Sequence, residues 1–168
     1  VSAADARALY ARAISIDATK RTARVGPGSL LGDLDREAQA HGLATPLGIN
    51  STTGVAGLTL GGGFGWLSRR HGMTVDNLLS ATVVTADGAV RKVSANAEPD
   101  LFWALRGGGG NFGVATSFEF QLHPVGPEVY AGLVVYPFAQ ARQVLRAWRD
   151  FTVTTPDELS VWTVMRKA

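Results

Sequence analysis

The chain has 168 residues, 46% of them hydrophobic and 18% charged, which is typical of one folded domain or one domain plus part of another. Its formal net charge is +2, with basic and acidic residues spread along the chain, so nothing predicts binding to nucleic acid or to an anionic membrane. Cysteine is absent, which excludes disulfides, thiolate zinc sites and iron–sulfur ligation. No apolar run approaches the ~20 residues of a membrane helix. We expect a soluble protein, and a cytoplasmic location is favoured over secretion.

The first part of the chain predicts a helix, a hairpin and a second helix. Residues 1–12 have a helical apolar face behind Ser2 as N-cap. Residues 14–17 and 22–25 alternate like two short strands around a polar turn. In the second helix Ser29 is the expected cap and the apolar stripe is Leu30, Leu31, Leu34 and Ala38, with Gly42 at the C′ position.

A second hairpin is expected from residues 78–85 and 89–93, because Asp87-Gly88 is a strong turn dipeptide. A short helix over 99–106 follows and ends at the glycines 107–110. Residues 114–122 then alternate as a half-buried strand, with Val114, Thr116, Phe118, Phe120 and Leu122 facing one side. Helices and strands in this order predict an α+β domain.

The run 124–127, Pro-Val-Gly-Pro, is the clearest domain boundary in the chain. Beyond it we expect a strand over 129–136, a helix over 138–151 and a strand over 159–165. These elements are too few to bury their own apolar faces. They predict the beginning of a second domain.

A glycine-rich stretch over residues 45–77 is the most informative part of the sequence. It holds glycines at 48, 54, 57, 61, 62, 63, 65 and 72. Such density indicates unusual backbone conformations or something that approaches the main chain closely. Ser51, Thr52 and Thr53 add hydroxyl groups that hold polar ligand edges. The hypothesis is a flat or phosphorylated ligand, and the alternative is a turn packed on other segments, with Leu58, Leu60, Phe64 and Trp66 as core.

Other sites find less support. Gly108-x-Gly110-x-x-Gly113 matches the dinucleotide fingerprint, but a helix precedes it and a strand follows, the reverse of the Rossmann order. No P-loop occurs. The histidines at 41, 71 and 123 lie far apart in sequence without carboxylates at ligand spacing, so we expect structural roles for them and no metal site.

Two stretches together carry a family resemblance, TTGVAGLTLGGGFGWLSRRHGMTVDNLLSATVVTADG and DLFWALRGGGGNFGVATSFEFQLHPV. They resemble, in the family's order, the flavin-binding domain of FAD-linked oxidases related to berberine bridge enzyme. The resemblance covers roughly residues 14–125. It implies a VAO/PCMH-type FAD-binding domain, with small mixed sheets flanked by helices, followed by the start of an α+β substrate domain.

The resemblance also implies which residues hold FAD. The segment 48–65 wraps the flavin ring and pyrophosphate in the family, and the strand entry at 113–114 passes the other end of the cofactor. Asp76-Asn77 matches a pair that mainly fixes a loop. The cofactor-binding residues expected here are Gly48, Ile49, Asn50, Thr52, Thr53, Gly54, Gly57, Leu58, Gly61, Gly63, Asn77, Gly113 and Val114.

The chain departs from the family pattern at three places. Asn50 stands where many relatives attach FAD through cysteine, so no thioether can form there. Leu58 stands where some relatives place a histidine near the flavin. No Arg-Gly-Gly-Gly-His type pyrophosphate loop occurs, so we expect a partial chain, with 1–125 as an FAD-binding domain lacking much of its first subdomain near residues 12–14 and 126–168 as the beginning of the substrate domain.

The function implied is that of an FAD-dependent oxidase. The complete protein would take a hydride from a carbon bearing a hydroxyl or amine and pass the electrons to oxygen. A small-molecule substrate and molecular oxygen are the expected partners. The catalytic base would lie outside this chain, since neither Tyr130 nor Tyr136 fits the family's Tyr-x-Asn motif. The alternative is a flavin- or nucleotide-binding homologue without turnover.

Overall fold

The computed structural model describes residues 13–166, so the helix expected over 1–12 lies outside the described residues. Its centre is a five-stranded antiparallel sheet in the order β1-β2-β6-β4-β5. The strands are β1 (Ile14–Asp17), β2 (Thr22–Val25), β4 (Leu78–Val84), β5 (Val90–Ser94) and β6 (Val114–Gln121). Two residues each from β3 (Leu43–Ala44) and β7 (His123–Pro124) form a second, small sheet. Both predicted hairpins are confirmed.

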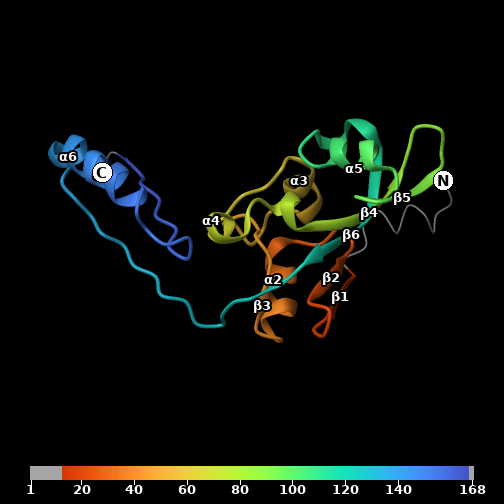
Figure 1. The fold of residues 1–168 in the computed structure, drawn as a ribbon, viewed down its shortest axis with the longest axis horizontal. Coiled ribbons are helices and arrows are strands. Elements are labelled where there is room, and N and C mark those ends of the chain that lie inside the picture. Colours follow the sequence, from red (N-terminus) through yellow and green to blue (C-terminus); the bar gives the residue numbers. More distant parts are fainter. Residues whose placement is uncertain (1–12, 167–168) are drawn as a thin grey trace.

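Short helices lie beside the sheet, except for the last one, which is set apart from it (Figure 1). The α-helices are α2 (Leu31–Gln39), α3 (Val55–Leu60), α4 (Ser68–His71), α5 (Pro99–Leu105) and α6 (Ala141–Thr152), and the 3₁₀ turns are η1 (Thr74–Asn77), η2 (Gly109–Phe112) and η3 (Phe138–Gln140). Helix α2 packs near β1 and α5 near β5. Figure 1 shows α6 set apart from the sheet, beyond an extended segment that follows β7. The described residues thus form an α+β fold, as predicted.

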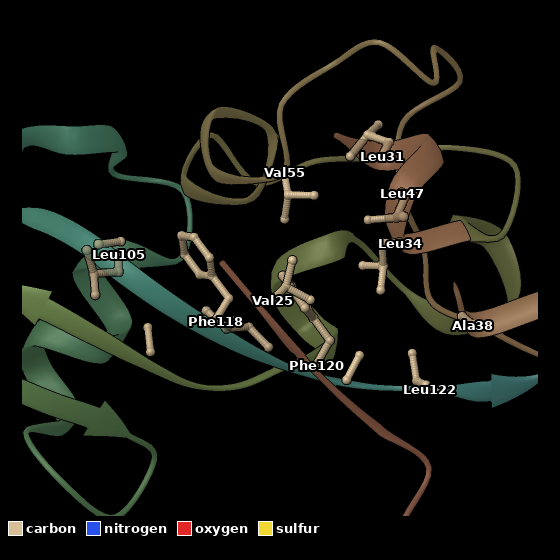
Figure 2. Close-up of a cluster of buried hydrophobic side chains, with 14 of the residues drawn as sticks. Val25, Leu31, Leu34, Ala38, Leu47, Val55, Leu105, Phe118, Phe120 and Leu122 are labelled. Atoms are coloured by element: carbon tan, nitrogen blue, oxygen red, sulfur yellow. The ribbon is translucent and has the colours of Figure 1, made fainter. Parts of the chain in front are cut away.

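The core lies where strand side chains meet the apolar faces of α2 and α3 (Figure 2). Its fully buried members include Val25 of β2, Phe118 and Phe120 of β6, Leu31 and Leu34 of α2, and Val55 of α3. Fully burying a side chain of this kind is worth roughly 1.5–3 kcal/mol. This packing holds the glycine-rich stretch, which contains α3, against the sheet.

The predicted ends of α2 were wrong. Leu30 is the residue before the helix, and its amide donates to the Asp33 carboxylate at 3.1 Å. Ser29 does not cap the helix, since its buried hydroxyl has no hydrogen-bond partner among the described residues. Its carbonyl accepts the Val55 amide at 2.9 Å, which ties it to α3. The last helical residue is Gln39, and Gly42, with φ +65°, closes the turn that follows.

The predicted alternation of β6 holds only from residue 118 onward. Val114 is 52% exposed, whereas Ala115 is buried. The pairing with β4 shifts between Thr82 and Val83, which leaves Thr116 as an extra residue on β6. A bulge of one residue exchanges the two faces of a strand, so the first positions point opposite to the expectation.

The two strands predicted beyond the boundary were also wrong. The described residues 129–136 and 159–166 contain no strand, and Figure 1 shows the former as an extended segment. An extended segment becomes a strand only when another backbone pairs with it, and no such neighbour is present among residues 13–166. The helix predicted over 138–151 is confirmed as η3 followed by α6.

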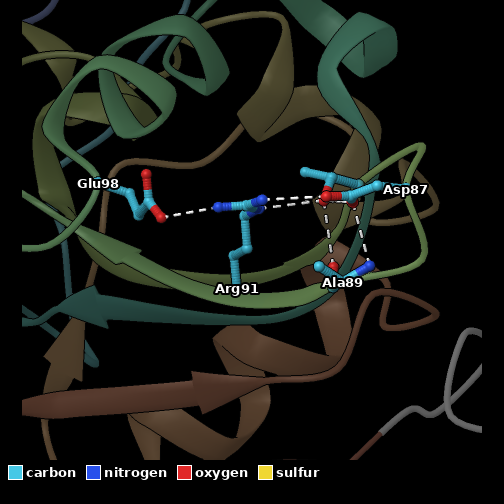
Figure 3. Close-up of polar contacts among 5 residues, drawn as sticks. Asp87, Ala89, Arg91 and Glu98 are labelled. Carbon is cyan, nitrogen blue, oxygen red and sulfur yellow. Dashed lines mark hydrogen bonds and ion pairs between the residues drawn. The ribbon is translucent and has the colours of Figure 1, made fainter.

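The turn between β4 and β5 shows why Asp87-Gly88 is a strong signal (Figure 3). Gly88 has φ +78°. The Asp87 carboxylate accepts from the Thr85 hydroxyl at 2.5 Å and from the Ala89 amide at 3.1 Å. Arg91 lies between Asp87 and Glu98, at 3.1 and 2.9 Å. These hydrogen bonds lower the pKa of Asp87 to about 2. The Thr85 hydroxyl contributes most, followed by the Ala89 amide and Arg91.

Candidate functional site

A pocket of about 410 Å³ opens beside α3. This size is within the roughly 300–1,000 Å³ that is typical of small-molecule sites. Its lining comes mostly from the glycine-rich stretch, with one residue from the far end of the chain: Gly48, Ile49, Asn50, Thr53, Gly57, Leu58, Gly61, Gly63, Phe64 and Trp162. Most of the residues predicted to bind FAD are therefore brought together around one cavity.

The loop before α3 is held by the start of α2. The Leu31 amide donates to the Thr53 carbonyl at 2.9 Å, and the Gly32 amide donates to the Ser51 carbonyl at 3.0 Å. A side chain at Gly32 would come within 2.9 Å of the Ser51 Cβ, so glycine permits this close approach. The start of α2 therefore holds one side of this polar loop. On its other side, Asn50 and Thr53 line the cavity.

Part of the glycine richness serves the fold itself. A Cβ at Gly65 would overlap the Leu47 carbonyl oxygen, and one at Gly63 would overlap the Thr74 side chain. Gly63 also has φ +70°, a conformation that other residues rarely adopt. The alternative of a packed turn is therefore correct for these glycines, although Phe64 and Trp66 are 62% and 54% exposed and do not belong to the core.

Gly57 is different, because nothing in the fold requires a glycine there. It lies inside α3 without a positive φ, and beyond its chain neighbours and the backbone of its own helix no described atom lies within 4 Å of the place where a Cβ would be. Glycine inside a helix costs about 1 kcal/mol relative to alanine. The free space above Gly57 belongs to the pocket. A flat ligand fits this arrangement, with a bare backbone beneath it and polar groups at one edge.

The other predicted residues lie outside the pocket lining. Thr52 and Gly54 flank Thr53 in the loop. Gly113 and Val114 follow η2, which packs near α3. Gly113 has φ +144°, and a Cβ there would lie 2.5 Å from the Val84 carbonyl oxygen, so its contact with β4 already explains the glycine.

Asn77 is 4% exposed, and its side chain is engaged by the protein. Its amide nitrogen donates to the carbonyls of His71 and Met73, both at 2.9 Å, and its amide oxygen lies 2.6 Å from His123 Nε2. Asp76 accepts from the Met73 amide at 2.8 Å and from Arg106 at 3.1 Å. The loop-fixing role expected of this pair is visible in these contacts.

The fold brings together two histidines that lie 52 positions apart in number, His71 and His123. Their rings stack at 3.9 Å with an interplanar angle of 13°. Burial lowers the pKa of both, and the charge of Arg70 adds to this. For His123 the neighbouring His71 contributes as well. Sequence reasoning missed this contact, since only β7 places His123 beside the end of α4.

Trp162 is the member of the pocket that sequence reasoning missed altogether. It was expected inside a strand of the second domain, yet it reaches the glycine-rich stretch.

None of the residues that line the pocket is ionisable. Among residues 13–166, no group of three or more His, Cys, Asp or Glu is placed to hold a metal ion. The chemistry offered by this side of the cavity is therefore apolar and hydrogen-bonding.

Known proteins share this fold and these motifs. Residues 5–94 match the FAD binding domain family. An FAD-linked oxidoreductase of Dictyostelium discoideum is 45% identical over 149 residues, which are 88% of this chain and 33% of that protein. The crystal structure of 6-hydroxy-D-nicotine oxidase from Arthrobacter nicotinovorans superimposes with a TM-score of 0.76 and 40% identity, over 83% of this chain and 31% of that one. The structure of the BBE-like protein 28 of Arabidopsis thaliana superimposes with a TM-score of 0.64 and 43% identity, over 68% of this chain and 24% of that one.

The chain belongs to the FAD binding domain family, because that match covers more than half of it. The resemblance to berberine bridge enzyme-like proteins and the VAO/PCMH-type fold are confirmed, and FAD is the cofactor of this family. The chain spans about a third of the length of the Dictyostelium discoideum relative. No helix within residues 13–166 is long and apolar enough to cross a membrane.

Proposed function

We propose that this chain is part of an FAD-dependent oxidase, and that the pocket beside α3 receives the flavin. The observation that carries this is the open space over Gly57, in a cavity lined by the glycine-rich stretch. The relatives named as oxidoreductase and oxidase support it. The substrate is a small molecule, and the final electron acceptor is molecular oxygen.

The reaction proposed is the two-electron oxidation of a carbon that bears a hydroxyl or amine. The C–H bond breaks with its electron pair, the hydroxyl or amine loses a proton, and oxygen takes up both electrons and both protons as hydrogen peroxide. When bound, FAD supplies the hydride acceptor and the route to oxygen. The residues of this chain bind, orient and shield: Asn50 and Thr53 contact polar edges, while Ile49 and Leu58 exclude water.

The general base is assigned to a part of the protein beyond residues 13–166. The lining of the pocket includes no ionisable residue, whereas removal of a hydroxyl or amine proton needs a group with a suitable pKa within hydrogen-bonding reach. Leu58 lines the pocket at the position where some relatives carry histidine. It has no donor for negative charge on a reduced ring, so that role falls to backbone amides or to another segment.

Residues 1–125 and 126–168 are proposed as two domains, the partial FAD-binding domain and the beginning of the substrate domain. The shift from a packed sheet to an extended segment after β7 supports this boundary (Figure 1). The thirteen residues named above remain the proposed cofactor contacts. Those that line the pocket are proposed to contact the ligand directly, and Asn77 and Gly113 to act by shaping its surroundings.

An absorption spectrum of the complete protein tests the proposal. Flavin bands that bleach when a small alcohol or amine is added without oxygen, and return with oxygen, are the expected result. Flavin bands that no such compound bleaches would favour the second candidate, a flavin-binding homologue without turnover. A colourless protein that does not take up added FAD would contradict both.

A further inference from the structure

The pocket beside α3 is completed by a residue from the far end of the chain. Its described lining comes from residues 48–64, with the single exception of Trp162. Gly57, which has open space above it, and Trp162 line the same cavity of about 410 Å³. A ligand that fills this cavity therefore contacts both the glycine-rich stretch and Trp162.

The ring of Trp162 reaches the pocket because segment 152–162 lies on residues 64–70. It stacks on Trp66 with ring centroids 4.3 Å apart and lies 6.0 Å from the ring of Phe64. These contacts cover the three side chains only in part, because Phe64, Trp66 and Trp162 are 62%, 54% and 38% exposed. Aromatic surface is therefore left free to contact a ligand.

Hydrogen bonds to the backbone fix the same arrangement. The Ser160 hydroxyl donates to the Trp66 carbonyl at 2.6 Å. Arg69 donates to the carbonyls of Thr152 and Thr155, at 3.0 and 2.7 Å. Together with the aromatic contacts, these bonds make up what we call the docking of segment 152–162. A side chain that is held in place in this way loses little conformational entropy when a ligand binds.

The docked segment is joined to the sheet by an extended connection. Figure 1 shows α6 set apart from the sheet, beyond the stretch that follows β7. Side chains of that stretch are exposed, among them Val134 at 72% and Val135 at 78%, so its packing does not fix the segment. A part of a protein that is held by few contacts opens locally at a small cost in free energy. A ligand that binds the docked form more tightly shifts this equilibrium toward docking.

The shared cavity and the partly exposed ring give Trp162 a role toward the cofactor. We propose that Trp162 contacts the bound flavin, so that flavin binding and the docking of segment 152–162 stabilise each other. This inference rests on the proposed flavin site. Contact between two flat aromatic rings adds to the effect of burying their area, which corresponds to roughly three- to tenfold in affinity. Because coupling between two equilibria is reciprocal, flavin strengthens the docking by the factor by which docking strengthens flavin binding.

The flavin affinity of the complete apoprotein tests the contact. Apoprotein from riboflavin-starved cells is mixed rapidly with FAD, so that the reversible binding step is measured before any covalent bond forms. We expect Trp162→Ala to weaken this binding roughly three- to tenfold, and Trp162→Phe, which keeps a flat ring, to stay within about twofold of the wild type. Trp103→Ala is the matched control and should bind FAD normally, because Trp103 is 77% exposed in α5 and does not line the pocket.

Amide hydrogen exchange over residues 152–162 tests the coupling. Saturating FAD should slow exchange there roughly three- to tenfold in the wild type and in Trp103→Ala, as reciprocity requires. In Trp162→Ala this slowing should be absent. A tryptophan that only holds the segment would give the same exchange with and without FAD. Exchange in β4 and β6 shows in parallel whether each variant is folded.

The outcomes separate this inference from the proposed function. Wild-type apoprotein that binds no FAD would overturn the flavin site and the inference with it. Normal FAD affinity in Trp162→Ala, or an equal slowing of exchange in that variant, would overturn the inference and leave the flavin site standing. The same holds if FAD leaves exchange over 152–162 unchanged in the wild type, a comparison that decides even where Trp162→Ala does not fold.

Discussion

At the scale of single residues, the glycines of the central stretch divide into two groups with different physical reasons. Gly63 and Gly65 are required by the fold, because a side chain there would overlap Thr74 or Leu47. Gly57 has no such neighbour. The two groups look the same in the sequence. A side chain at Gly63 or Gly65 should destabilise the fold, whereas one at Gly57 should not.

Gly57→Ala should therefore move two measurements in opposite directions. We expect the free energy of unfolding of the apoprotein to rise by about 0.5–1 kcal/mol, because alanine is the better helix residue. Flavin affinity should fall, and with Gly57→Val it should fall further, by tenfold for each ~1.4 kcal/mol of steric conflict. Chemical denaturation and FAD titration measure the two effects.

Gly110→Ala is the control, since a Cβ there also meets open space but lies outside the pocket. Equal flavin binding in all three variants would remove Gly57 from the site.

Asn50 leads to a prediction about covalent attachment. Asn50 lines the pocket, and no cysteine is present in the chain. Mass analysis of flavopeptides from acid-precipitated holoprotein should show at most one covalent bond to FAD. Asn50→Cys should add one covalent bond to FAD in the complete protein if the flavin lies where we propose, and Ser51→Cys, one residue away and outside the lining, should not. A doubly linked wild-type flavin would refute this prediction.

The stacked pair of His71 and His123 predicts how stability depends on pH. Both histidines have a folded-state pKa below the ordinary value of 6.5, chiefly through burial. The unfolded chain therefore binds protons first as the pH falls, so the stabilising contribution is complete above about pH 6.5 and is lost below it. The urea midpoint should fall between pH 7.5 and 5.5. The variant His123→Gln should flatten this change, and His41→Gln, in the exposed turn after α2, should not. A wild-type midpoint that rises on acidification would contradict the assignment.

At the scale of elements, the contact between the Trp66–Arg70 region and the segment 152–162 depends on one arginine more than on its neighbour. The Arg69 side chain is 29% exposed and lies 3.6 Å from Asp157. It donates to the carbonyls of Thr152, the last residue of α6, and of Thr155. Arg70 is 49% exposed and makes one ion pair, at 3.7 Å, with Glu158. Exposed ion pairs contribute little, whereas hydrogen bonds from a charged group to partly buried carbonyls contribute more.

Arg69→Met should loosen this segment, and Arg70→Met should change it little. We expect amide hydrogen exchange over residues 152–162 to become faster in the first variant, by an amount that corresponds to roughly 1–3 kcal/mol of local stability. Exchange in β4 and β6 serves as the internal reference. Equal protection of the segment in the two variants would show that Arg69 does not hold it more than Arg70 does.

At the scale of the whole molecule, the segment between β7 and α6 exposes many apolar side chains. Its exposed members include Val129, Tyr130, Leu133, Val134, Val135, Tyr136 and Phe138. A run with strand composition and no paired backbone is a site for aggregation. The match covers only 33% of the length of the Dictyostelium discoideum relative, so about two thirds of that protein have no counterpart in this chain.

The 168 residues expressed alone should therefore self-associate and hold FAD weakly. Val134→Asp should reduce light scattering at a given concentration while leaving the melting of the sheet unchanged, because Val134 contacts no part of the core cluster. Val93→Asp is the contrasting variant: Val93 is fully buried in that cluster, so the same substitution should unfold the domain. A monodisperse, cooperatively melting chain with submicromolar FAD affinity would disprove this prediction.

The sequence by itself determined the features that depend on local patterns. Both hairpins, the apolar stripe of α2, the α+β class and the family follow from short periodicities and ordered motifs, because these reflect neighbouring residues. Only the tertiary structure decided the features that depend on distant partners. The bulge in β6 depends on its pairing with β4, the stacked histidines on the course of β7, and Trp162 on the return of the chain after α6 to the glycine-rich stretch. The failure of 129–136 to form a strand has the same cause, since a strand exists only together with the backbone beside it.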